Sequence, residues 1–272
     1  MPHNVLIVGA TRGLGLALTK SYAKHGHNVY GTARSPPTPD LEKITKNWIP
    51  DVNLASPSCS TNLLRGLSAL SSSAVHLDIV ILTAGYFSTE DFGSAGNEGD
   101  ALDWDAQVKM YTISAIAPPH IVAALVKSKH LGPGSKVLLV TSESGSITLR
   151  AASEGGGNFG HHGSKAAENM VSKLLSLDLK ERGVAVGAVH PGFMRTEMTK
   201  GVGFDQFYED GGAVTPEVAA ESLVSWIEGE FGMGKTGEYW APRGARDIGT
   251  AEEVLGKDLP GMKKPEPMRL PW

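Results

Sequence analysis

The sequence predicts an α/β fold in which a single, doubly wound parallel sheet carries helices on both faces. Two observations lead to this prediction. Short runs such as residues 4–8, NVLIV, are apolar throughout, which is typical of strands buried on both faces. Amphipathic segments of helical length lie between these runs, so strand and helix alternate. The 272 residues contain no internal repeat and no long linker, and 41% of them are apolar, enough for a sizeable core. We therefore expect one domain over residues 1–272.

The individual elements follow from these patterns in chain order. We expect strands at residues 4–8, 28–32, 48–49, 77–82, 137–140, 184–189 and 238–241, and helices at 14–25, 58–71, 101–128, 164–180 and 216–228. Residues 93–100 form a loop in this prediction, and 242–272 an extended C-terminal tail. Pro118 and Pro119 should kink or break the helix at 101–128. In the helix at 164–180 the core-facing side chains should be Ala167, Met170, Val171, Leu174 and Leu177.

Composition argues against several classes of function. The net charge of -4 and pI of about 6.1 do not suit a nucleic-acid surface, so we expect no nucleic-acid partner. We find no window of roughly 20 apolar residues, so we expect no membrane segment. The single cysteine, Cys59, precludes an internal disulfide and favours a reducing, cytoplasmic location. His161, His162 and His190 have no cysteine or carboxylate at ligand spacing, so no metal site is predicted.

A glycine-rich loop follows the first strand directly. Its glycines are Gly9, Gly13 and Gly15, and an apolar helix comes next. Such a loop lets the backbone approach a pyrophosphate, which the N–H groups at the start of the helix then bind. The alternative is a purely structural turn between strand and helix. The position of the loop favours nucleotide binding.

Two arginines lie where a dinucleotide cofactor would present its adenosine ribose. Arg34 follows the second strand, and Arg12 lies in the glycine loop. An acidic residue is usual there when the ribose 2′-hydroxyl is free, whereas guanidinium groups suit a 2′-phosphate. We therefore favour NADP(H) over NAD(H). The alternative is that both arginines are ordinary solvated side chains.

The order of the motifs resembles that of the short-chain dehydrogenase/reductase family, in particular its carbonyl-reductase-like branch. The resemblance runs from about residue 5 to residue 196. It rests on VGATRGLG, DVNL, LTAG, VTSESG, HHGSK and HPGFMRT, in that order. It implies a Rossmann fold, a nicotinamide cofactor and the reduction of a carbonyl, or oxidation of an alcohol, on a small organic substrate.

The resemblance assigns site residues position by position. Cofactor binding falls to the loop residues Gly9, Thr11, Arg12, Gly13, Leu14 and Gly15, and to Arg34, Asp51, Val52, Thr83, Ala84, Gly85, Lys165, Pro191, Gly192, Phe193 and Thr196. Ser142 matches the serine that holds the substrate oxygen, and Lys165 the lysine that binds the nicotinamide ribose. Two departures concern the catalytic set: the tyrosine of the family is His161 here, and the asparagine of its proton relay is Ser114.

His161 changes the proton chemistry. A nearby Lys165 cation lowers the pKa of a histidine, which starts from about 6.5, so the imidazole should be neutral at pH 7. A neutral imidazole is a weak acid, an adequate base and a hydrogen-bond donor. Three hypotheses remain open: an NADP(H)-dependent reductase in which His161 replaces tyrosine, a non-redox acid/base enzyme on the same scaffold, and a catalytically degenerate NADP-binding protein.

Further expectations concern the surroundings of this site. By the family resemblance, residues 197–215 form a lid over the substrate, in which Phe204, Phe207 and Tyr208 build an aromatic wall; the alternative is a surface loop. Tyr86 and Phe87, after the fourth strand, are expected to border the pocket, and Tyr86 is a possible substitute proton donor; Glu143 and Ser144, beside Ser142, either reach the pocket or lie on the loop surface. The resemblance also suggests a homodimer or homotetramer that pairs through the helices at 101–128 and 164–180.

Overall fold

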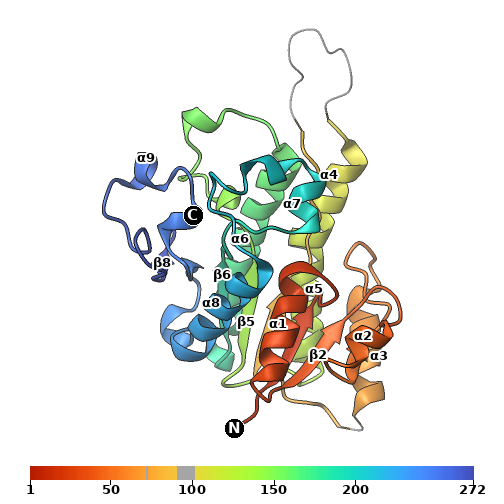
Figure 1. The fold of residues 1–272 in the computed structure, drawn as a ribbon. Coiled ribbons are helices and arrows are strands. Elements are labelled where there is room, and N and C mark those ends of the chain that lie inside the picture. Colours follow the sequence, from red (N-terminus) through yellow and green to blue (C-terminus); the bar gives the residue numbers. More distant parts are fainter. Residues whose placement is uncertain (72, 91–101) are drawn as a thin grey trace.

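One eight-stranded sheet organises the chain in a computed structural model that describes residues 1–71, 73–90 and 102–272 (Figure 1). Its strands are β1 Asn4–Val8, β2 Asn28–Thr32, β3 Asn47–Ile49, β4 Ile79–Leu82, β5 Lys136–Val140, β6 Ala185–Val189, β7 Tyr239–Ala241 and β8 Met268–Arg269. They lie in the order β3-β2-β1-β4-β5-β6-β7-β8, and all pairs are parallel except β7 with β8. The order reverses between β1 and β4, which marks the crevice where such sheets bind ligands. The predicted doubly wound α/β fold is confirmed.

Helices cover both faces of the sheet, as predicted. Helices α1 Gly13–Lys24 and α8 Pro216–Gly229 pack together over one face (Figure 1). Their buried side chains, among them Leu18, Tyr22 and Trp226, share a core cluster with β1. Helices α3 Cys59–Leu70, α5 Ala117–Lys127 and α6 Phe159–Leu179 border a second cluster on the opposite face. The short helices are α2 Pro39–Glu42, α4 Trp104–Tyr111, α7 Glu197–Gly201 and α9 Ala251–Leu255.

The prolines alter the helix expected at 101–128 without breaking it. A π-helical segment, η1 Thr112–Ile116, joins α4 to α5. Pro118 and Pro119 have no N–H, so the carbonyls of Ser114 and Ala115 lose their usual donors, and the helix widens there instead of ending. Ala101 and the loop expected at 93–100 lie outside the described residues.

The same helical run corrects our expectation about apolar windows. Trp104–Lys127 is 24 residues long and contains an 18-residue window with a mean hydropathy of 1.2, so by length and composition it could cross a membrane. Its inner side chains Ile121, Val122 and Leu125 are buried in the second core cluster, as in a helix that covers a sheet.

Helix α6 is oriented differently from the prediction. The supposed core residues Met170, Leu174 and Leu177 are 59%, 52% and 58% exposed. The buried face is polar instead and contains Lys165, Glu168, Asn169, Ser172 and Ser176. Apolar periodicity identified the helix correctly but placed these three side chains on the wrong face, whereas the predicted Val171 does pack against the second core cluster.

The start of α6 also lies five residues before the predicted one. Asn158 adopts a left-handed conformation (φ 48°), and the buried carboxylate of Glu90 accepts a hydrogen bond from Gly160 N at 2.5 Å. A carboxylate at a helix N-terminus satisfies free N–H groups and opposes the positive end of the helix dipole. His161 and His162 therefore lie in the first turn of the helix, not before it.

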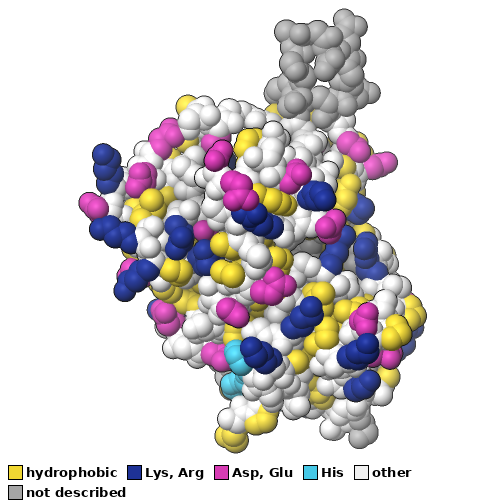
Figure 2. Space-filling model, viewed as in Figure 1, with side chains coloured by type: hydrophobic (Ala, Val, Ile, Leu, Met, Phe, Trp, Pro, Cys, Tyr) yellow, Lys and Arg dark blue, Asp and Glu magenta, His cyan; other side chains and the backbone are white. Residues whose placement is uncertain are grey.

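The C-terminal segment 242–272 folds back instead of extending as a tail. It contains α9 and β8, and β8 pairs antiparallel with β7. Met268 and Leu270 are buried beside Tyr239, and the backbone carbonyl of Trp272 accepts hydrogen bonds from Thr148. On the face drawn in Figure 2, cationic and anionic side chains are interspersed.

Candidate active site

The glycine loop packs against the end of β4, so its glycines are required for space. Gly9 has a φ of +94°, and a Cβ there would lie 2.9 Å from the Ala84 backbone. A Cβ on Gly15 would lie 2.0 Å from the Gly9 carbonyl oxygen and 2.7 Å from the Thr83 hydroxyl. That hydroxyl donates to the carbonyls of Val8 and Gly9, at 3.0 and 3.2 Å. Thr83, which the family resemblance predicted to lie at the cofactor, thus also holds the loop in place.

The segment after β6 reaches the same loop. A Cβ on Gly13 (φ +52°) would lie 3.8 Å from Thr196 Cγ2, and Thr196 caps helix α7. At the other end of the segment, Gly192 (φ +101°) has no room for a Cβ, which would meet the buried carboxylate of Asp247 at 2.5 Å. Pro191 is buried, and Phe193 packs on Tyr208 with ring centroids 5.7 Å apart. The predicted residues from Pro191 to Thr196 therefore run from the end of the sheet to the glycine loop.

A cavity of about 530 Å³ opens beside the glycine loop, at the end of β2. Its lining includes Thr11, Lys20, Arg34 and Ser35. Arg34 is where the sequence placed it, at the expected adenosine side. Arg12 is exposed and is not part of this lining; the second cation is Lys20, from α1. This cavity is where an adenosine phosphate would meet two cations.

The remaining predicted cofactor residues differ in exposure. Asp51 is exposed, with a φ of 63°, at the end of β3, and so is available to a ligand. Val52 and Leu14 are buried in the two core clusters, so their side chains support the site from beneath. A Cβ on Gly85 would lie 3.6 Å from Met198 Cε, which places the start of the predicted lid over the end of β4.

A chain of hydrogen bonds joins Ser142 to His161 through Ser144. Ser142 lies two residues after β5, and its hydroxyl oxygen accepts from Ser144 N at 3.2 Å and from Ser144 Oγ at 2.8 Å. Ser144 Oγ is in turn 3.3 Å from His161 Nδ1. The structure thus brings together the predicted pair Ser142 and His161, linked by a residue to which the sequence assigned no role.

His161 lies in an apolar and cationic environment. Its ring stacks on Phe87 with centroids 4.0 Å apart, and Phe204 packs edge-on against Phe87 at 5.4 Å. Burial, with smaller contributions from Lys165, His162 and Arg150, lowers the pKa of His161 to about 3. The imidazole is therefore neutral at pH 7, as predicted, but burial outweighs the lysine that the sequence argument named.

Lys165 is held in a buried ion pair. Its Nζ donates to Glu168 Oε2 at 2.7 Å and to the Val140 carbonyl at 3.1 Å, and both side chains are almost fully buried. Burial raises the pKa of Glu168 to about 7, although Lys165 opposes that shift. Two of the three ammonium hydrogens are thereby occupied, which leaves one for a cofactor ribose.

Ser114 lies in η1, which packs against α6. It is 1% exposed, and its hydroxyl has no hydrogen-bond partner among the described residues. A buried, unpaired hydroxyl costs free energy unless water or a ligand satisfies it.

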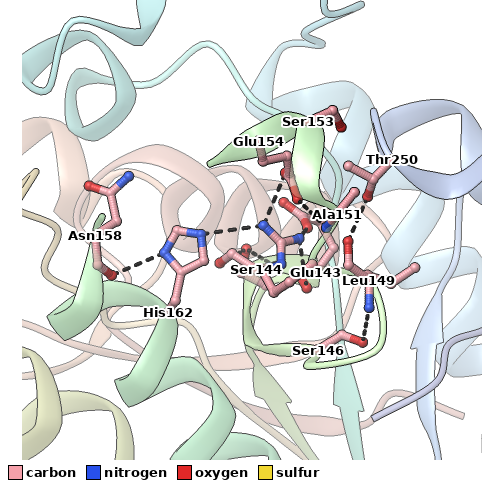
Figure 3. Close-up of polar contacts among 12 residues, drawn as sticks. Glu143, Ser144, Ser146, Leu149, Ala151, Ser153, Glu154, Asn158, His162 and Thr250 are labelled. Carbon is pink, nitrogen blue, oxygen red and sulfur yellow. Dashed lines mark hydrogen bonds and ion pairs between the residues drawn. The ribbon is translucent and has the colours of Figure 1, made fainter. Parts of the chain in front are cut away.

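A second polar cluster, centred on Arg150, braces the loop after β5 (Figure 3). Arg150 pairs with Glu143 and donates to Glu154 Oε1 at 3.0 Å, and its Nη1 is 3.4 Å from His162 Nε2. Because arginine only donates, His162 Nε2 accepts and its Nδ1–H donates to the Asn158 carbonyl at 3.0 Å. His162 is therefore engaged in this cluster and not directed at Ser142.

His190 joins that loop to the end of β6. Its Nδ1 accepts a hydrogen bond from Glu143 N at 3.1 Å, and burial lowers the pKa of His190 to about 4. This contact ties the loop after β5 to the Pro-Gly turn that follows β6.

Sequence reasoning missed Lys20, Arg150 and Glu168, and it expected Phe87 and Ser144 near the pocket without their contacts to His161. The Glu168 signal was present, because a charged side chain one turn from Lys165 on a helix predicts a pair. Ser144 and Phe87 gave no such signal, since their contacts join segments 17 and 74 residues apart. Tyr86 is covered by Lys109, whose Nζ lies 3.9 Å from the ring centroid.

Comparison with known proteins agrees with this architecture. The family model for short chain dehydrogenases matches residues 3–206. A 1-hydroxy-2-glutathionyl-2-methyl-3-butene dehydrogenase from Rhodococcus sp. (strain AD45) is 30% identical over 224 residues, which cover 82% of this chain and 90% of the relative.

Two solved structures share the fold. The NADPH-bound carbonyl reductase from chicken fatty liver superposes with a TM-score of 0.71 at 22% identity, covering 89% of this chain and 96% of its own. The Pseudomonas aeruginosa RhlG/NADP active-site complex superposes with a TM-score of 0.69 at 19% identity, covering 87% and 93%. At these identities the likeness concerns the fold alone.

Proposed function

The chain belongs to the short-chain dehydrogenase family, and on that premise we propose that it is an NADP(H)-dependent oxidoreductase that reduces a carbonyl, or oxidises the matching alcohol, of a small organic substrate. The observation that carries the proposal is the convergence of Ser142, His161 and Lys165 beside the carboxyl end of β5. A hydroxyl, an imidazole and an ammonium at the ligand-binding edge of the sheet can hold an oxygen, handle its proton and bind a ribose.

The preference for NADP(H) is supported by the cavity at the end of β2. Lys20 and Arg34 line it, and two cations complement a 2′-phosphate that NAD(H) lacks. NADPH and NADP also occupy the two solved structures described above. The nicotinamide, when bound, would supply or accept the hydride, while Thr196 and the glycine loop would hold the phosphates.

Calorimetric titration with NADPH and NADH tests the cofactor. We expect Arg34→Ala to weaken NADPH binding about tenfold, because an exposed charge-assisted contact contributes about 1.5 kcal/mol, and to leave NADH unaffected. The matched control is Lys24→Ala, because Lys24 is an exposed cation that lies on α1 and does not line the cavity. Equal affinities for the two nucleotides in the wild-type protein would contradict the preference.

The role of His161 is tested by activity. In the proposed reaction Ser142 anchors the substrate oxygen and His161 takes the place of the family tyrosine. NADPH consumption over a panel of carbonyl compounds should fall about 10²-fold or more in His161→Ala, which is typical of losing an acid/base group. Unchanged turnover in that variant would refute the role.

A non-redox acid/base reaction is the second candidate, and the environment of His161 favours it. A neutral imidazole at pH 7 is a better base than acid, and Lys165 is already paired with Glu168. This candidate predicts product without net NADPH oxidation, and one-to-one oxidation would exclude it.

A degenerate NADP-binding protein, the third hypothesis, predicts that Ser142→Ala changes no activity.

We infer that the protein assembles as a homodimer or homotetramer through α4, η1 and α6. The exposed apolar side chains Trp104, Val108, Tyr111, Met170, Leu174 and Leu177 lie on these packed elements. Because an isologous interface pairs one patch with its own copy, Leu174→Glu should yield monomers in light scattering. A monomeric wild-type protein would contradict the assembly.

We further infer a cytoplasmic location, in keeping with a single, buried cysteine.

A further inference from the structure

Ser144 is placed between the two groups that would act on the substrate oxygen. It is 7% exposed, and its hydroxyl lies within hydrogen-bond distance of both Ser142 Oγ and His161 Nδ1. Ser142 and His161 have no direct hydrogen bond to one another among the described residues, and the hydrogen bonds that connect them there run through Ser144.

The direction of each hydrogen bond follows from counting donors. A hydroxyl has one hydrogen and two lone pairs. Ser142 Oγ accepts both the N–H and the O–H of Ser144, which occupies its lone pairs. Its own hydrogen has no acceptor among the described residues and is free for a substrate oxygen.

The same count determines the tautomer of His161. Because the Ser144 hydrogen is donated to Ser142, the Ser144 oxygen can only accept from His161, whose Nδ1 must therefore carry a hydrogen. Among the described residues Nε2 has no hydrogen-bond partner. His161 thus donates to Ser144 and Ser144 donates to Ser142, which leaves the Ser142 hydrogen for a substrate oxygen.

A neutral imidazole needs such an arrangement. Burial is the main reason that the ring is neutral, and two cations add to it together with His162: Lys165 from the same helix, which is paired with Glu168, and Arg150 from the loop after β5, which is paired with Glu143 and Glu154. An imidazolium is therefore disfavoured at pH 7. A neutral ring that donated a proton without receiving another would become an imidazolate, so its two nitrogens must exchange protons together.

We propose that Ser144 is a relay residue that carries the proton from His161 to Ser142, and that Ser142 delivers it to the substrate oxygen. The inference rests on the proposed reductase function. Bound NADPH would supply the hydride for the new C–H bond. The substrate oxygen forms its O–H bond with the Ser142 hydrogen, Ser142 is reprotonated by Ser144, and Ser144 by His161 Nδ1. His161 Nε2 takes a proton from solvent water, so one solvent proton is consumed for each carbonyl reduced.

The first test observes the tautomer and needs no activity. In ¹⁵N spectra of the imidazole at pH 7, His161 of the wild-type protein should carry its hydrogen on Nδ1, and Ser144→Ala should shift it towards Nε2. Ser146→Ala is the matched control, since Ser146 is a buried hydroxyl of the same loop that, within the described part of the chain, accepts from Leu149 N and is hydrogen-bonded to neither Ser142 nor His161 (Figure 3). A wild-type ring protonated on Nε2 alone would overturn the proposal, even if the protein proves to be a reductase.

The second test is kinetic. Ser144→Ala should lower kcat about 10²-fold while NADPH affinity by calorimetry stays within twofold, whereas Ser146→Ala should keep kcat within threefold. In mixtures of H₂O and D₂O, the kcat of the wild-type protein should vary non-linearly with the fraction of deuterium, because several protons move together. Equal kcat values in Ser144→Ala and Ser146→Ala would refute the relay. A wild-type protein that reduces no carbonyl would refute the proposed function, and the tautomer would still test the hydrogen-bond series.

Discussion

Replacing Gly15 by alanine tests the packing of the glycine loop directly. The added Cβ would lie 2.0 Å from the Gly9 carbonyl oxygen, 2.7 Å from Thr83 Oγ1 and 2.9 Å from the Gly9 carbonyl carbon. Two of these neighbours are backbone atoms, which cannot rotate away as a flexible side chain would. Relief therefore requires α1 to move away from the end of β4, and the loop to move with it.

The magnitude follows from two opposing effects. Alanine is favoured over glycine within a helix by about 1 kcal/mol, whereas overpacking a tight site costs about 1–3 kcal/mol and occasionally more. Because the closest contact is with backbone, we expect the upper end of that cost or beyond, for a net loss of about 2–3 kcal/mol in the free energy of unfolding. A domain of this size then melts roughly 4–12 °C lower.

Urea unfolding followed by circular dichroism measures this loss. The control is Gly229→Ala, the same chemical change in α8, where a Cβ would meet nothing within 4 Å. It should be neutral or slightly stabilising. The loop displacement should also weaken NADPH binding in Gly15→Ala. A variant within about 0.5 kcal/mol of wild type, the usual range for innocuous substitutions, would refute the packing argument.

Three other predictions concern single groups. The pKa of Glu168 is about 7 in the folded protein and 4.5 in the unfolded chain, so the unfolded chain releases this proton first as the pH rises. Between pH 4.5 and 7 the free energy of unfolding of the wild type should therefore fall by about 3 kcal/mol relative to that of Glu168→Gln. Parallel curves of stability against pH for the two proteins would contradict this. Phe87→Ala should raise the pKa of His161 towards 6.5 in an NMR titration, because burial is the largest cause of its depression; an unchanged midpoint would show that the stacking is irrelevant. Thr83→Val should lower the free energy of unfolding by about 1 kcal/mol through loss of its hydrogen bonds to the glycine loop, and Thr83→Ser should restore it.

Much of the fold could be predicted from the sequence, because strands buried on both faces need continuous apolar runs. The strands at 4–8 and 28–32 were predicted at their observed bounds. The face of α6 could not be predicted in this way. Its apolar stripe points outward, and its buried face is polar because it carries Lys165 and Glu168 towards the site.

The residues of the candidate site also fall into those that the sequence could name and those that it could not. The glycine loop, Arg34, Ser142, His161 and Lys165 could be named in advance because each belongs to a motif of local spacing. The partners of those residues were not predictable. Lys20, Phe87 and Ser144 contact the site only after the chain folds.

By itself, then, the sequence determined the alternation of strands and helices and the family, and it predicted His161 and Ser114 at the places of the usual tyrosine and asparagine. Tertiary structure alone decided which groups surround His161, and hence that its ring is neutral, stacked on Phe87 and joined through Ser144 to Ser142. The physical reason is the separation along the chain over which each interaction acts. Backbone preference and apolar periodicity act over a few neighbouring residues and are written in the order of the chain. Desolvation and hydrogen-bond direction depend on atoms that folding brings together from distant segments.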